Sequence, residues 1–316
     1  MNKLKERKNK VSKALAITKK IILLLVFIVL IPLLLTELYL KKIGLGDPIT
    51  YEADFVYGYA PKAKQVKVRF KNSKVTINDK GLRSIEDWKN NPKKKILFLG
   101  DSVTYGGSYI DDKETFSYLV CKELGNDKFS CGNAGVNAYG IFNIVYRSRY
   151  DERIQEAEII IFNLIPDDFY RGLQNSETAH FYLNDKKFPF PAIVEAINFV
   201  SVKYDINKYI SKFSTSENTK NKNNLISESI DLFVSEVDRL ERINKKVLLL
   251  FSPNIYENGK ISDETKYIYK RLIKKTNKKI IYLKNFLTNK HLIDSVHYNK
   301  LGHELVAQKI VEELNK

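Results

Sequence analysis

The chain has 316 residues, of which 44% are hydrophobic and 12% aromatic, so it can bury one substantial core. Its formal net charge is +16, but the basic residues form no stripe interleaved with aromatic residues, which argues against nucleic acid as a partner. These totals favour one folded domain of about 220 to 260 residues preceded by a membrane anchor.

Residues 1–20 form a basic tail with eight Lys or Arg side chains against one Glu. Residues 21–40 read IILLLVFIVLIPLLLTELYL, which Pro32, Thr36 and Glu37 interrupt near the far end. Twenty apolar residues span about 30 Å of hydrocarbon, and the basic flank favours a cytoplasmic N-terminus. The run exceeds a signal-peptide core, and no small-x-small cleavage site follows it. We therefore predict a single-pass signal anchor over 21–40 in the cytoplasmic (inner) membrane, with the remainder extracytoplasmic or periplasmic.

Residues 41–91 are predicted to form a lead-in hairpin or linker. Apolar side chains alternate over residues 66–70 and again over 75–77, with a turn-like Lys-Asn-Ser between them, which predicts two paired strands. Gly81 is expected to adopt a backbone conformation that other residues resist. Arg83 is expected to form a surface ion pair, while a contact with a carboxylate near the functional site or with substrate is the alternative.

Residues 92–316 alternate between strand and helix patterns. Such alternation favours parallel strands joined by right-handed crossovers, hence an α/β fold with a three-layer α/β/α sandwich. A polar loop is predicted over 214–224. The expected strands and helices are the strands at 95–100, 129–134, 159–165, 246–251 and 280–283, and the helices at 115–124, 225–243 and 265–274 with a last one from about residue 301.

A candidate nucleophile follows the first of these strands. The run KILFLGDSVTYGG over residues 95–107 reads as strand, tight turn and helix, which places Ser102 at the carboxyl end of a parallel strand. A serine needs a base. Asp294 and His297 lie three residues apart before the last helix, a spacing that lets the carboxylate hold one imidazole nitrogen while the other faces the serine. We predict Ser102, His297 and Asp294 as nucleophile, base and orienting acid.

The ordered set of Gly100-Asp101-Ser102, late Asp294-x-x-His297 and the lead-in INDKGLR at 77–83 resembles the SGNH, or GDSL, hydrolase superfamily over residues 51–316. The resemblance implies ester chemistry through an acyl-serine, with no metal and no organic cofactor. It also implies an oxyanion hole whose second block falls on 133–140. The usual glycine of that block falls on Ala138, and Gly135 is close enough to leave the position open.

The third block of the family normally carries Asn-Asp, whereas this chain has Asp167-Asp168. An ionised Asp167 cannot donate to an oxyanion and would repel it. Four alternatives stay open. Asp167 could be protonated and donate, Asn163 could supply the amide, backbone donors could act alone, or catalysis could be lost.

The resemblance to exported members implies a serine esterase that removes O-acyl, above all O-acetyl, groups from an envelope polysaccharide. The alternatives are an O-acetyltransferase supplied by a partner such as a membrane acyltransferase, an esterase acting on a lipid ester, and a membrane-tethered binding protein with impaired catalysis. Cys121 and Cys131 are the only cysteines. A disulfide and two free thiols are both open, and a zinc site is not expected because no His cluster lies near them.

Overall fold

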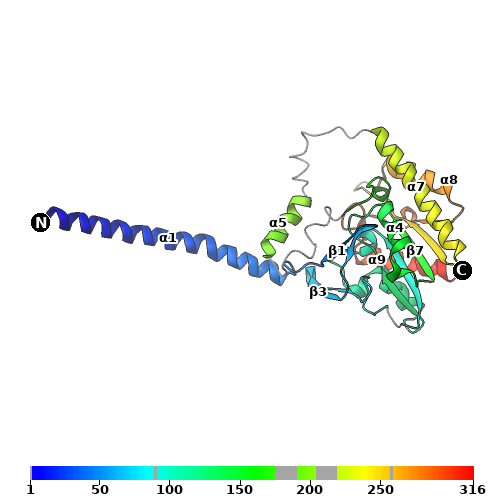
Figure 1. Cartoon of the computed structure of the whole chain (residues 1–316), viewed down its shortest axis with the longest axis horizontal. Helices are drawn as coiled ribbons and strands as arrows, with labels where there is room; N and C mark the ends of the chain where they lie inside the picture. Colours follow the sequence, from blue (N-terminus) through cyan, green and yellow to red (C-terminus); the bar gives the residue numbers. More distant parts are fainter. Residues whose placement is uncertain (1, 89–90, 176–190, 204–218, 257–258) are drawn as a thin grey trace. The chain divides into compact units, whose positions relative to one another are not determined.

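The computed structural model describes residues 2–88, 91–175, 191–203, 219–256 and 259–316 (Figure 1). The chain forms two compact units, Met1–Asp47 with Phe188–Ser211, and Pro48–Lys187 with Lys212–Lys316. The first unit contains the described helices α1 (Asn2–Lys42) and α5 (Ala192–Lys203). Within α1, Lys10–Lys42 is long and apolar enough to cross a membrane, and its apolar side chains are exposed. The long apolar helix predicted near the N-terminus is therefore present.

The second unit is built on a five-stranded sheet in the order β6-β5-β7-β8-β9. Every neighbouring pair in it is parallel, as predicted. The strands are short apolar runs, typical of parallel strands buried on both faces. Their bounds are β5 (Lys94–Gly100), β6 (Phe129–Asn133), β7 (Ile159–Leu164), β8 (Lys246–Phe251) and β9 (Ile280–Tyr282).

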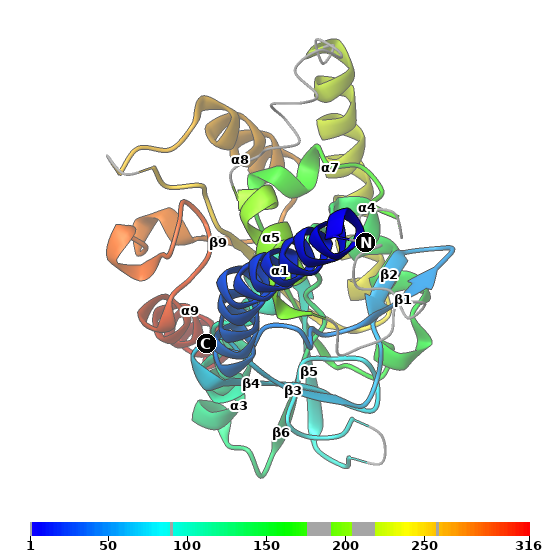
Figure 2. The same ribbon diagram turned by 90° about the vertical axis from the view of Figure 1, so that its left-hand side faces the viewer.

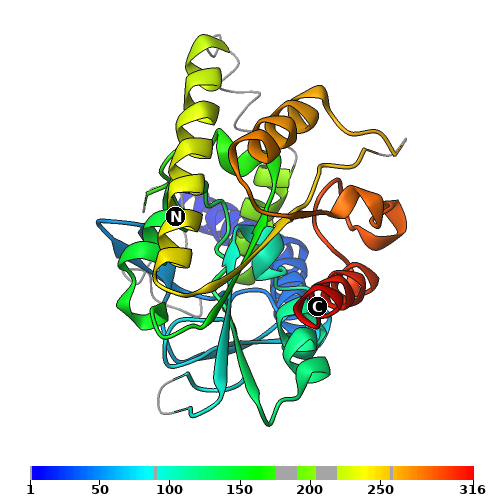
Figure 3. The ribbon, with the colours of Figure 1, turned by 90° about the vertical axis from the view of Figure 1, so that its right-hand side faces the viewer.

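Helices cover both faces of this sheet. They are α2 (Ser102–Tyr105), α3 (Phe116–Leu124), α4 (Ile141–Tyr150), α7 (Thr219–Arg242), α8 (Asp263–Lys275) and α9 (Lys300–Leu314). Successive side chains of a strand point to opposite faces. Ile96 and Phe98 of β5 accordingly pack in one core cluster with α3 and α9, whereas Leu97 and Leu99 pack in another with α4, α7 and α8. Figure 3 shows helices on both sides of the sheet. The predicted three-layer α/β/α sandwich is confirmed.

Two hairpins precede the sheet. The strands β1 (Tyr51–Asp54) and β2 (Gly58–Pro61) pair antiparallel, as do β3 (Gln65–Arg69) and β4 (Ser73–Ile77). The second hairpin is the predicted one, and it lies beside β5 and β6 (Figure 2). Arg83 links it to β6 by backbone bridges to Ile77 and Asn133. The predicted polar loop over 214–224 lies outside the described residues up to 218, and from Thr219 onward it is wrong, because α7 begins there.

Arg83 is buried, with 4% of its surface exposed, so the expected surface ion pair is wrong. Its guanidinium pairs with Asp112 at 3.1 Å and donates to the carbonyl oxygens of Tyr105 (2.8 Å), Gly107 (2.7 Å) and Ile110. The fork of guanidinium N–H groups suits this task because it satisfies several buried carbonyls at once. Arg83 therefore fixes the segment that follows α2.

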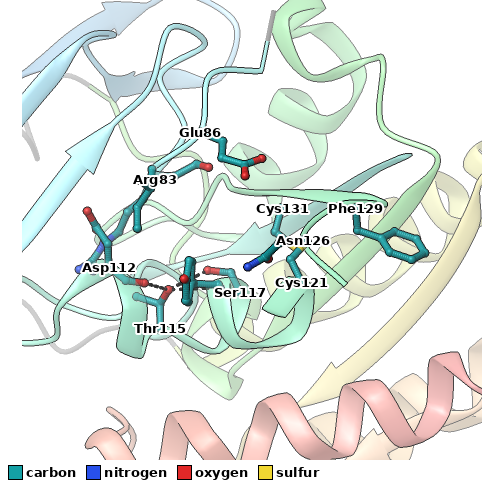
Figure 4. A pocket seen from close by; sticks show the side chains of 12 residues that line it. Arg83, Glu86, Asp112, Thr115, Ser117, Cys121, Asn126, Phe129 and Cys131 are labelled. Carbon is teal, nitrogen blue, oxygen red and sulfur yellow. Dashed lines mark hydrogen bonds and ion pairs between the residues drawn. A yellow bond between two sulfur atoms is a disulfide. The ribbon is translucent and has the colours of Figure 1, made fainter. Parts of the chain in front are cut away.

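Cys121 of α3 and Cys131 of β6 form a disulfide, with Cα atoms 5.9 Å apart. The alternative of two free thiols is therefore wrong. The bridge joins one helix layer to the edge strand of the sheet. It lines a small cavity that also contains Arg83 and Asp112 (Figure 4).

Candidate active site

Ser102 lies where the strand order reverses. Because β5 pairs with β6 on one side and β7 on the other, its carboxyl end is the switch point at which open α/β sheets bind ligands. Ser102 begins α2, and the preceding Asp101 caps this helix by accepting the N–H of Val103 at 2.9 Å. A Cβ on Gly100 would clash with Thr104 Oγ1, so the tight turn requires glycine there.

The structure brings His297, which lies 195 residues further along the chain, to Ser102, together with Asp294. Ser102 Oγ lies 2.9 Å from His297 Nε2, and His297 Nδ1 lies 2.7 Å from Asp294 Oδ2. The other oxygen of Asp294 accepts the backbone N–H groups of His297 (2.8 Å) and Val296 (2.9 Å). One carboxylate therefore shapes the turn and orients the imidazole. This turn ends before α9 begins, so the Asp-x-x-His spacing works here in a turn.

The surroundings of His297 favour its charged form. Burial lowers the pKa of His297, but the hydrogen bond to Asp294, the charge of Asp294 and that of Asp101 raise it, and the net pKa lies above 6.5. For Asp294, burial raises the pKa, whereas hydrogen bonds from His297 and from backbone N–H groups lower it to about 2. Asp294 is thus an anion at neutral pH, beside a base that can take up a proton.

A buried ion cluster that the motifs did not indicate adjoins the serine. Arg171 Nη1 donates to Asp101 Oδ2 (2.9 Å), to Asp168 Oδ1 (3.2 Å) and to the carbonyl oxygen of Tyr139 (2.9 Å). Asp101 and Asp168 are fully buried. Ser102 Oγ lies 3.3 Å from Asp101 Oδ2, so Arg171 neutralises the carboxylate nearest the hydroxyl.

The environment of Asp168, the second carboxylate of this cluster, favours its uncharged form. Burial and the nearby charge of Asp101 raise the pKa of Asp168 well above its ordinary value, while Arg171 acts against this. Asp168 Oδ2 also accepts the backbone N–H of Ile165 at 2.9 Å, which fixes the end of β7. The only sequence signal for the cluster was the acidic pair at 167–168, since two adjacent carboxylates at a buried strand end need a cation.

Two expected oxyanion donors are engaged elsewhere. The N–H of Gly135 donates to Asn133 Oδ1 at 2.9 Å, and Gly135 packs against the backbone of α2 so closely that a Cβ would clash. Asn163 is buried and bonds to Ser252 (2.7 Å) and Tyr298 (3.3 Å) inside the core. We therefore do not retain Gly135 or Asn163 as donors.

The other two expected oxyanion positions, Ala138 and Asp167, are partly exposed. Ala138 has a φ of +64°, the left-handed conformation that favours glycine. Within the described residues, the backbone N–H groups of Ala138 and Ser102 donate to no acceptor. Asp167 lies 3.6 Å from Arg171 Nη2 and accepts the Asn254 amide at 3.0 Å. Its carboxylate is therefore partnered.

Ala138→Gly is expected to stabilise the chain by about 1 kcal/mol, because an L-residue in the left-handed region costs about 1–2 kcal/mol. The check is the free energy of unfolding in denaturant. Ala134→Gly is the control, since Ala134 is buried in the core and lacks a positive φ. It should lower stability, and equal effects of the two variants would contradict the strain at Ala138.

No family model and no curated protein matches the sequence. Solved structures do match. The acetyl xylan esterase AlAXEase is 16% identical with a TM-score of 0.44, over 70% of this chain and 99% of that one. An acetyl xylan esterase from Geobacillus stearothermophilus is 15% identical (TM-score 0.44; 70% and 94% covered), and a protein of the G-D-S-L family from Desulfitobacterium hafniense is 12% identical (0.41; 70% and 99%).

Proposed function

We propose that this chain is a serine esterase of the SGNH, or GDSL, type that cleaves O-acyl esters through an acyl-serine. The observation that carries the proposal is the continuous hydrogen-bonded series from Ser102 Oγ through His297 to Asp294 at the switch point of the sheet. A hydroxyl, an imidazole and an ionised carboxylate in this order form an activated nucleophile.

In the first half of the reaction, Ser102 Oγ attacks the ester carbonyl carbon while His297 Nε2 takes its proton. Asp294 stays ionised and stabilises the imidazolium. The bond to the leaving alcohol then breaks, and His297 returns the proton to that alcohol. In the second half, water attacks the acyl-serine with His297 as base, which releases the carboxylic acid and restores Ser102.

The negative charge on the attacked oxygen needs donors. We assign this role to the backbone N–H groups of Ser102 and Ala138. Arg171 supports them by neutralising Asp101, which otherwise would place a negative charge beside the reacting oxygen. The contacts of Asp167 with Arg171 and Asn254 disperse its charge, which favours catalysis over the alternative of a binding protein with an impaired site.

The kcat/KM for ester hydrolysis is expected to fall as pH drops, with a midpoint above 6.5. The reason is that His297 must be neutral to act as a base, and its pKa is raised above that value. A pH profile with a small aryl acetate measures the midpoint. Asp294→Asn removes the charge that favours imidazolium, so this variant should shift the midpoint to lower pH as well as lower the rate. A wild-type midpoint well below 6.5 would contradict the assignment of the base.

The helix α1 supports a location at the cytoplasmic membrane. We propose that it is a retained signal anchor with its N-terminus in the cytoplasm and that the esterase unit is extracytoplasmic. The side chains of His297 and Asp294 are 30% and 52% exposed, so these groups are open to solvent, which suits a bulky polymeric alcohol. We therefore propose O-acetyl esters of an envelope polysaccharide as substrates.

The test uses the purified full-length chain in detergent with nitrophenyl esters of increasing acyl length and a fluorophosphonate label. Among the nitrophenyl esters, we expect the acetate to be hydrolysed fastest. We also expect the chain to release acetate from an O-acetylated polysaccharide. Preference for long acyl chains would instead support a lipid esterase, and faster transfer to added glycan hydroxyls than to water would support a transferase. Absence of both turnover and labelling in the folded chain would contradict the esterase proposal.

A further inference from the structure

Glu37 interrupts the apolar run of α1, and its carboxylate accepts hydrogen bonds from another helix. Its carboxylate accepts the backbone N–H groups of Ala192 (2.9 Å) and Ile193 (3.0 Å), the first residues of α5. The first N–H groups of a helix have no partner within the helix, so Glu37 caps α5. Glu195 of α5 in turn accepts the N–H of Gly46 at 2.6 Å. These two contacts fasten α5 beside the C-terminal end of α1 (Figures 1 and 2).

One side of α5 is apolar and exposed. Val194, Ile197 and Val200 are 40%, 59% and 45% exposed, whereas Ala192 and Glu195 are buried. The spacing of three residues places the exposed side chains in one stripe along the helix. Burying apolar surface is worth about 25 cal/mol per Å², so a continuous stripe of this kind marks a surface that contacts something other than water.

A groove between α1 and α5 is also lined by apolar side chains. Apart from the capping carboxylate, the side chains that line it within the described residues are all apolar: Leu30, Leu33, Leu34, Glu37, Pro191 and Ile193. The leucines of this groove belong to the exposed apolar surface of α1. Whatever medium surrounds α1 at this level therefore also reaches the groove and α5.

We infer that α5 is a second membrane-contacting element, which lies against the outer end of α1 and turns its apolar stripe toward lipid acyl chains of the outer leaflet. The inference rests on the proposed role of α1 as a membrane anchor. Lipid is the favoured occupant because the stripe and the groove continue the surface that α1 would bury in the bilayer.

The depth of the contacts agrees with this arrangement. At 1.5 Å per residue, Glu37 lies about 6 Å from Lys41 along the helix, and Leu30 lies about 10 Å deeper. The cap is thus near the membrane interface and the leucines are within the hydrocarbon. A carboxylate is tolerated at such a depth when it is paired, and Glu37 also forms an ion pair with Lys41 at 3.2 Å.

The test places single spin labels in the full-length chain, reconstituted in vesicles of phosphatidylcholine and phosphatidylglycerol. Because the two native cysteines form a disulfide, an introduced thiol is labelled selectively. Labels go to Val194 and Val200 on the stripe, to Leu24 within α1 as the lipid reference, and to the exposed Gln308 of α9 as the water reference. Accessibility to oxygen and to a water-soluble nickel chelate reports lipid and water contact.

We expect labels at Val194 and Val200 to resemble the Leu24 label, and Glu37→Leu to move both toward the water reference because the cap is lost. Thr36→Leu is the matched control, since Thr36 is exposed on α1 and should leave both labels unchanged. Water contact at the stripe with lipid contact at Leu24, or no response to Glu37→Leu, would overturn the inference alone. Water contact at Leu24 would overturn the anchor as well, while hydrolysis of a soluble aryl acetate reports independently on the esterase.

Discussion

Ser102→Ala is expected to abolish ester hydrolysis while leaving the fold intact. The hydroxyl contacts His297 Nε2 and Asp101 Oδ2, and both partners keep their other hydrogen bonds when it is removed. Without Oγ no acyl-serine can form, so kcat should drop by about 10⁴-fold or more, down to what binding and the oxyanion donors give alone. The midpoint of thermal unfolding should change little, because only one partly exposed oxygen is lost.

The measurement compares kcat and covalent fluorophosphonate labelling of the wild type and the variant. Ser295→Ala is a matched control, because Ser295 lies in the same turn as Asp294 and His297 and its side chain makes no hydrogen bond within the described residues. This control should keep both turnover and labelling. If Ser102→Ala retained activity, Ser102 would not be the nucleophile.

The parts of the molecule that the sequence predicted are those with a local signal. The strand β5 is a run of apolar residues followed by a glycine turn, and the Asp294/His297 pair precedes a periodic helix pattern. Gly81 shows the same rule, since its φ is +70° and a Cβ would lie 2.7 Å from the carbonyl oxygen of Pro61. In each case the residue type and the short run around it indicate the local conformation, so the pattern sufficed.

The parts that were missed depend on distant contacts. Arginine side chains are mostly exposed, so the sequence indicates a surface position for Arg83. It is buried because three carbonyl groups and Asp112 surround it. The first turns of α7 are polar, a composition that predicts a loop. The segment of α5 is so rich in apolar residues that its sequence does not distinguish a helix from a buried strand. Arg171 belongs to no motif, and only the fold brings its guanidinium to Asp101. These contacts join residues that are far apart in the chain, so no local pattern around Arg83 or Arg171 identifies their partners.

Replacing Arg171 by glutamine is expected to lower kcat and to move the low-pH limb of kcat/KM upward. Arg171 lowers the pKa of His297 and neutralises Asp101, which raises it. Without the guanidinium, the imidazolium is more stable, so His297 stays protonated to a higher pH and fewer molecules hold an active base. The uncompensated Asp101 carboxylate would also oppose the developing oxyanion next to Ser102. We expect a loss of about 10²-fold in kcat, similar to that of a lost oxyanion donor.

A structural explanation of the same loss must be separated from this one, because breaking a buried ion pair costs about 3–5 kcal/mol by itself. Arg153→Gln provides the matched control. Arg153 is 25% exposed in its side chain and pairs with Asp151, which is 2% exposed, compared with 24% for Arg171 and 0% for Asp101. Both variants should lose stability in denaturant unfolding, but only Arg171→Gln should shift the pH limb, and Arg171→Lys should restore much of its position by returning the charge. An unshifted limb in Arg171→Gln would reduce Arg171 to a structural residue, and an equal shift in Arg153→Gln would show that the limb reports stability instead of the charge beside His297.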